Sequence, residues 1–327
     1  MSYGDLIRDA FRITLRNRFL WFFGFFAGSA LPNFPSGGGN FGTDDFERSG
    51  GAGTSALAAQ FGSSALDSVV LVVGIVILVL LIVLLFVVMS IISQGALSES
   101  VAAIDRGEGR RFGSTFRTGL RNFWRVLGYY VLFFLIAVGL LVAIGVPTAL
   151  VIGGTFVATQ STGARIIVAV LAGLVALALL ILIFVPLHII SRYALREIVV
   201  RRMRVFGSVG SGYGVFRSNL GRSLLLWLIH IGLMIGIGVA LLVAVLLVGL
   251  VLFIPTIALG LAEYTAAAIV AGVIAGLILL PLLLAASGAA GTFGHSYWTL
   301  AYLRLTTPTE TAPTGTTPPP DSSPSLG

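Results

Sequence analysis

Three histidines are the residues of this chain best suited to bind a metal ion or to transfer a proton: His188, His230 and His295. Protein metal sites usually need ligands at close spacing, such as two histidines four positions apart on one helix face. These histidines lie far apart in the sequence, no carboxylate accompanies them, and cysteine is absent. The pattern therefore predicts no metal site, no cofactor and no catalytic residues. It also predicts that His230 faces another helix or a water-filled gap.

A glycine-rich stretch at 207–214 (GSVGSGYG) has the composition of a loop that binds phosphate through backbone amides. It has no Gly-Lys-Ser/Thr ending and follows no predicted strand, so a nucleotide-binding P-loop is excluded. Because Arg204 and Arg217 flank it, a site for a lipid phosphate is one interpretation. A plain flexible turn is the interpretation that we favour.

The composition indicates that these residues belong to a membrane protein. Of the 327 residues, 57% are hydrophobic and 10% are charged, whereas ordinary soluble domains carry about 25% charge. A bilayer core about 30 Å thick needs roughly 20 apolar residues in a helix. Runs of that length occur at 68–93, 125–151, 164–190, 223–255 and 264–290. A shorter segment at 19–31 is either a sixth span or the core of a cleaved signal peptide, and we favour a span.

The predicted spans carry no ionisable residue at their centres. Proton-coupled transporters and intramembrane proteases need such groups beside the transport path or the scissile bond. A non-enzymatic protein is therefore the prediction.

The distribution of arginine predicts the orientation. All 20 basic residues are arginine, and 18 of them precede span one, follow span six, or lie between spans two and three or four and five. Loops rich in arginine stay in the cytoplasm. The strong bias toward arginine over lysine is typical of a GC-rich bacterial genome. We therefore predict a multi-pass protein of the bacterial plasma membrane with both termini in the cytoplasm.

A short motif recurs at intervals of about 100 residues, each time just before a predicted span: FRITLRN at 11–17, FRTGLRN at 116–122 and FRSNLGR at 216–222. The even-numbered spans two and four end in the shared pattern Ala-Leu-x-Glu, at 96–99 and 194–197. The odd-numbered spans close at prolines 32, 147 and 255.

Each repeat therefore consists of an amphipathic basic helix, an outward span, a turn and a return span. The predicted fold is all-α, with six transmembrane helices in three repeated hairpins preceded by interfacial helices. Residues 1–305 form one domain with units at 5–107, 108–205 and 206–305. Residues 33–66 are predicted to be a flexible extracytoplasmic loop. The Pro- and Thr-rich residues 306–327 are predicted to be a disordered cytoplasmic tail.

The basic helices suggest a site for lipid headgroups. Within 5–18 the charged residues cluster on one side and the apolar residues fill the rest, which is typical of a helix lying in the membrane interface. A guanidinium binds phosphate oxygens through two parallel hydrogen bonds. The candidate headgroup-binding residues are Arg12, Arg117, Arg217, Arg121 and Arg222. The alternative is that these arginines only set the orientation.

The basic helix, the hairpin repeat and the span ends at 96–99 and 194–197 resemble those of a group of poorly characterised bacterial polytopic proteins. These in turn are similar to the membrane domain that precedes some glycerophosphoryl diester phosphodiesterases. The resemblance covers most of residues 1–305. The acidic and histidine residues of the phosphodiesterase domain have no counterpart here, so the resemblance implies a stand-alone membrane domain and transfers no catalytic residue.

Two functions fit these observations. The first is a non-enzymatic scaffold or lipid-interacting subunit of the cell envelope, with anionic membrane lipids and other membrane proteins as partners. Nucleic acid is not a predicted partner, because the arginines lie at the ends of spans. The alternative is the membrane subunit of a transporter for an apolar or lipid substrate. A lateral opening lined by Ser, Thr and His would favour the transporter.

Overall fold

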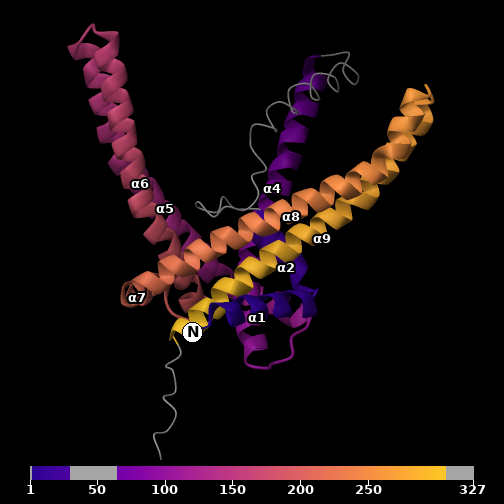
Figure 1. Ribbon diagram of the computed structural model, residues 1–327, viewed down its shortest axis with the longest axis horizontal. Coiled ribbons are helices and arrows are strands. Elements are labelled where there is room, and N and C mark those ends of the chain that lie inside the picture. The colour runs from indigo at the N-terminus through magenta and orange to yellow at the C-terminus, as the bar shows by residue number, and fades with distance from the viewer. Residues whose placement is uncertain (1, 30–64, 307–327) are drawn as a thin grey trace, which may run out of the picture.

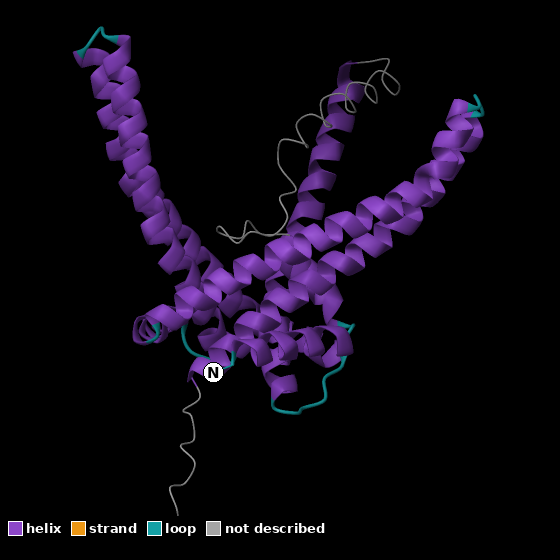
Figure 2. Cartoon of the chain, viewed as in Figure 1, coloured by secondary structure: helices purple, strands orange, loops and turns teal. Residues whose placement is uncertain are grey.

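The computed structural model describes residues 2–29 and 65–306, in which all regular secondary structure is helical (Figure 2). The helices are α1 (Tyr3–Arg16), α2 (Leu20–Ser29), α4 (Ala65–Asp105), α5 (Phe112–Ala158), α6 (Thr162–Val199), α7 (Val205–Ser218), α8 (Leu220–Leu261) and α9 (Thr265–Thr306). The all-α prediction is confirmed for these residues. The loop predicted at 33–66 and the tail predicted at 306–327 lie outside the described residues, apart from the helical positions 65, 66 and 306.

Five helices, α4, α5, α6, α8 and α9, are long and apolar enough to cross a membrane. The chain is therefore a multi-pass membrane protein. The sixth predicted span corresponds to α2, which has ten residues. At 1.5 Å per residue the described part of this segment is about 15 Å long, which is half of a bilayer core.

The long helices extend beyond the predicted spans, and two of the prolines that we expected to end spans lie inside helices. Pro147 lies within α5 and Pro255 within α8, which corrects the prediction at both positions. A proline removes one backbone hydrogen bond, but lipid offers no alternative partner for the remaining backbone groups, so the helix stays the favoured conformation. Beside Pro147, the Thr148 hydroxyl donates to the carbonyl oxygen of Ile144 at 2.7 Å.

The molecule consists of a packed base and three diverging arms (Figure 1). The pairs α5–α6 and α8–α9 form antiparallel hairpins that make two of the arms, and the first half of α4 makes the third. We define the base as residues 3–29, 90–105, 112–133, 188–199, 205–230 and 288–306. The arms are the remaining parts of the five long helices.

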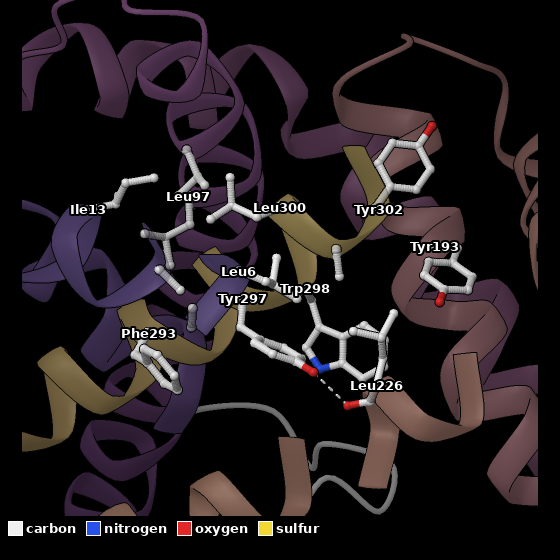
Figure 3. Packing of buried hydrophobic residues seen from close by; sticks show 14 of the residues in the cluster. Leu6, Ile13, Leu97, Tyr193, Leu226, Phe293, Tyr297, Trp298, Leu300 and Tyr302 are labelled. Atoms are coloured by element: carbon white, nitrogen blue, oxygen red, sulfur yellow. Dashed lines mark hydrogen bonds between the residues drawn. The ribbon is translucent and has the colours of Figure 1, made fainter. Parts of the chain in front are cut away.

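Nearly all buried side chains lie in the base. Leu6, Leu97, Tyr193 and Trp298 are fully enclosed there (Figure 3). In the same cluster the Tyr297 hydroxyl donates to the carbonyl oxygen of Leu226 at 2.9 Å. The apolar side chains of the arms are mostly exposed. Such a surface is far larger than the apolar patches of soluble proteins and is suited to contact with lipid tails.

The helices of the base cross closely at glycines. A Cβ at Gly24 of α2 would lie 2.1 Å from the carbonyl oxygen of Gly288 in α9, and a Cβ at Gly119 of α5 would lie 2.4 Å from the carbonyl oxygen of Ile92 in α4. Side chains at these positions would force the backbones apart. The small residues therefore fix α1–α2 against α9 and the start of α5 against α4; α7 packs on α6 in the same way.

Candidate functional site

The five candidate headgroup-binding arginines all lie exposed on the base. Arg12 of α1 is 3.6 Å from the carboxylate of Asp9, and Arg121 of α5 is 3.3 Å from that of Glu99. The other three form no ion pair with a described residue; they are Arg117, Arg217 and Arg222. These guanidiniums remain available to an external anion.

The amphipathic helix α1 is present, but its apolar side contacts protein. Leu6, Ala10 and Ile13 are buried in the core of the base, and the ring of Phe11 packs on Phe293 of α9 with centroids 4.5 Å apart. A helix that lies in the membrane interface, as the sequence predicts for 5–18, would place this side among acyl chains, whereas these residues pack on protein. The polar side of α1, including Arg12, stays exposed.

The glycine-rich stretch at 207–214 is helical and forms most of α7, so the flexible turn and the phosphate loop are both corrected. Its buried residues, Ser208, Gly212 and Phe216, recur at a spacing of four and form one face. A Cβ at Gly212 would lie 3.1 Å from the carbonyl oxygen of Ile190, so close packing on α6 explains the small residues. The basic element of the second unit is likewise not separate, because 116–122 lies inside α5.

The turn between α4 and α5 carries exposed charges. Glu108 accepts hydrogen bonds from Arg106 at 2.9 Å and Arg110 at 3.1 Å. The hydrogen bond from Arg106 is the main reason that the pKa of Glu108 lies below its usual value, and the positive charge of Arg110 adds to the effect. This turn therefore adds positive charge next to the base, and Glu108 neutralises part of that charge.

A second set of charges lies inside the base. The guanidinium of Arg196 is fully buried and donates to the carbonyl oxygen of Arg192 at 2.8 Å. It also reaches α9, where it donates to the Thr299 hydroxyl at 3.4 Å and the His295 carbonyl oxygen at 3.5 Å. The neighbouring Glu197 is buried too, with its carboxylate 3.7 Å from Arg201. Arg196 thus connects α6 to α9 through uncharged oxygens.

The three histidines are buried on three different helices. His230 of α8 stacks on the ring of Tyr297 of α9 with centroids 5.3 Å apart, which confirms that it faces another helix. Within residues 2–29 and 65–306, no group of three His, Cys, Asp or Glu residues is placed to hold a metal ion.

A cavity of about 270 Å³ lies between α4, α5 and α6. Its polar lining residues lie toward the base: Gln94, Tyr129, Tyr130, His188, Ser191 and Arg192. Three of them form hydrogen bonds within the chain. Gln94 donates to the Ala27 carbonyl oxygen at 3.5 Å, Tyr129 donates to the Ser191 carbonyl oxygen at 2.9 Å, and the Ser191 hydroxyl donates to the His188 carbonyl oxygen at 2.7 Å.

A second cavity of about 690 Å³ adjoins the first on the side of the arms. It lies along α5 and α6, reaches Trp227 of α8, and shares Phe134, Ala137, Phe184 and His188 with the first cavity. His188 is its most polar lining residue; the others are apolar apart from the Trp227 indole N–H. The two cavities together are amphipathic, with polar groups toward the base and apolar walls toward the arm.

The polar side of this site was not predicted as a site. In the sequence, Arg192 and Arg196 are two of the arginines that predict the orientation, and His188 is far from the other two histidines. The three residues are spaced by four and therefore lie on one face of a helix. This row of polar residues at the end of an apolar span is the feature of the sequence that could have indicated the site.

The chain belongs to the family described as "Family of unknown function (DUF7544)", which it matches over residues 12–309. No curated protein and no solved structure matches it. The matched residues include most of the base and all three arms, and the family description assigns no activity.

Proposed function

We propose that this protein is a non-enzymatic, lipid-interacting subunit of the cell envelope whose base lies at the cytoplasmic face of the plasma membrane and binds anionic lipids. The observation that carries the proposal is the exposure of all five candidate arginines on the base. Arginine near a membrane surface attracts anionic lipid by about 1 kcal/mol per residue. The resemblance to the membrane domain of glycerophosphoryl diester phosphodiesterases stays a prediction.

The proposal includes the six-span topology of three hairpin units with both termini in the cytoplasm. It is supported by the arginines, which follow the rule for cytoplasmic loops, and by the packing of α1, the start of α5 and α7 on α9, α4 and α6. Each of these basic elements precedes an outward helix and contacts the return helix of another unit. Because the chain has no cysteine, single cysteines can test the topology. Labelling of Glu108→Cys and Gln160→Cys from the same side of the membrane would contradict it.

The lipid-binding part is tested by the triple variant Arg12→Gln, Arg117→Gln, Arg217→Gln. Loss of three surface charges should weaken association with anionic lipid by up to about 3 kcal/mol and leave neutral lipid almost unchanged. Native mass spectrometry of the full chain with phosphatidylglycerol or phosphatidylcholine measures the difference. The matched control is Arg165→Gln, at the far end of the α5–α6 arm, where the guanidinium already donates to Thr159 and Phe156. Equal retention of anionic lipid by the triple variant would leave these arginines with a role in orientation only.

A transporter subunit for an apolar or lipid substrate is the second candidate. The observation that favours it is the pair of adjoining cavities, in which His188 and Ser191 lie beside apolar walls. Movement of fluorescent lipid between leaflets of reconstituted vesicles separates the two functions. A lipid-binding subunit alone should leave the rate at that of protein-free vesicles.

A further inference from the structure

Two polar side chains of the first cavity have no partner within the described residues. The guanidinium of Arg192 and the hydroxyl of Tyr130 both line the cavity, and neither forms a hydrogen bond or an ion pair with residues 2–29 or 65–306. A guanidinium stays protonated in proteins, so Arg192 carries its charge into the cavity. The side chain of Arg192 is partly buried, and a charge that loses part of its water without gaining a partner is destabilised. No Asp or Glu is among the lining residues, so no carboxylate of the described residues balances the charge of Arg192 in this cavity, and the guanidinium is available to an anionic ligand.

The rest of the space is shaped for an apolar chain. The second cavity, of about 690 Å³, lies within the range of roughly 300–1,000 Å³ that is common for ligand sites. It continues from His188 toward the arm along Phe184 and Ala137. A soluble anion would gain nothing from these walls, whereas the tail of an amphiphile would cover them. The outer faces of the same helices carry exposed Leu135 and Leu182, so the surrounding lipid is the adjacent source.

We propose that this pair of cavities binds one anionic phospholipid, which enters sideways from the surrounding leaflet. Its phosphate accepts hydrogen bonds from Arg192 and Tyr130, and one acyl chain lies between α5 and α6 toward Trp227. The inference rests on the proposed function, because it names a single internal site for the lipid class that the exposed arginines attract. It differs from surface association in its stoichiometry of one and in its dependence on residues that are not on the exposed face.

The test compares the full-length protein with Arg192→Gln, Tyr130→Phe and Ala137→Trp. Each is purified in mild detergent, incubated with equal amounts of phosphatidylglycerol and phosphatidylcholine, and analysed by native mass spectrometry. The wild type should retain one phosphatidylglycerol after surface lipid is removed. Arg192→Gln should lower the affinity for it roughly tenfold or more, as expected for a charge-assisted hydrogen bond, and Tyr130→Phe should lower it by a smaller factor. Ala137→Trp fills the space shared by the cavities and should displace lipid of either headgroup.

Two controls keep the result interpretable. Arg125→Gln removes an exposed charge from α5, the helix that carries Tyr130 and Ala137, and should retain the internal lipid. Arg192→Lys preserves the charge without the planar fork and should recover part of the affinity. If Arg192→Gln does not fold, the comparison of Arg192→Lys with Tyr130→Phe and Ala137→Trp carries the test.

The outcomes separate the internal site from the proposed function. Unchanged retention in Arg192→Gln and Ala137→Trp would overturn the internal site, whatever the triple surface variant shows. Loss of internal lipid in these variants beside unchanged surface association in the triple variant would support the internal site and contradict the proposed role of the surface arginines. Equal competition by glycerol phosphate would identify a site for a soluble anion and overturn the lipid assignment.

Discussion

The two parts of α6 show how differently the arms and the base are built. Between 162 and 187 no residue is buried, and large apolar side chains such as Leu174 and Leu182 are more than half exposed. From His188 to Val199 almost every residue is buried, including Arg196 and Glu197. The apolar half of α6 is therefore exposed, and the half that carries the charged residues is buried. A helix of a soluble protein shows the reverse, with apolar residues buried and charged residues exposed. Lipid can cover the arms, whereas the base is held by packing and hydrogen bonds within the chain.

This difference predicts that substitutions in the base affect stability and that equivalent substitutions in the arms do not. The largest effect is expected for Arg196→Ala, which removes the buried link between α6 and α9 and leaves a cavity. A loss of about 3 kcal/mol in the free energy of unfolding is expected. Unfolding in increasing sodium dodecyl sulfate measures it, with the exposed Arg222→Ala as the control. Equal stability of the two variants would show that the buried guanidinium does not hold the base together.

A pair of alanine substitutions in α5 compares base and arm within one helix. Gly119→Ala should destabilise by about 1–3 kcal/mol, because its Cβ would meet the carbonyl oxygen of Ile92 at 2.4 Å. Gly139 lies in the arm with no neighbour within 4 Å of a built Cβ, so Gly139→Ala should stabilise the helix by up to about 1 kcal/mol. Thermal unfolding in detergent measures both. The same sign for the two variants would remove the distinction between the regions.

The smallest expected effect concerns the junction between α4 and α5. Glu99 accepts from Asn122 at 2.9 Å and from the exposed Arg121 at 3.3 Å. Glu99→Gln keeps an acceptor for Asn122 and loses the ion pair, so the expected cost is about 0.5 kcal/mol, and it should shrink as salt is added. Chemical unfolding at low and high salt checks this. A cost that does not change with salt would assign the effect to packing.

The helices of the arms could be predicted from the sequence, but the packing of the base could not. Long apolar runs predicted the five long helices, because length and composition decide whether a helix can span a bilayer. The sequence does not distinguish the glycines at close crossings from the others: Gly24, Gly119 and Gly212 meet backbone atoms of other helices, whereas Gly236 and Gly276 have no neighbour within 4 Å of a built Cβ. The sequence around a glycine does not indicate which helix it will contact. Only the packing of distant segments determines which glycines lie at close crossings.

In the candidate site, the exposed arginines could be predicted from the sequence, but the cavity could not. Exposure of the surface arginines followed from their amphipathic pattern, as at Arg12. The cavity required α4, α5 and α6 to meet, and no local pattern encodes the distance between three helices.

The prolines were misleading because the surroundings change their effect. In water, Pro147 and Pro255 would favour the end of a helix. In lipid, the unpaired backbone groups of a helix end cost more than a proline inside the helix.

The contact between α2 and α9 has a consequence for how the protein is made. The Thr292 hydroxyl of α9 donates to the carbonyl oxygen of Leu20, 272 positions earlier in the chain. At a synthesis rate of about 5–20 residues per second, α2 waits on the order of tens of seconds for its partner. During that interval the glycine face of α2 and the inner side of α1 have no protein cover. A nascent chain interrupted before α9 therefore leaves both surfaces without the helix that covers them in the complete fold.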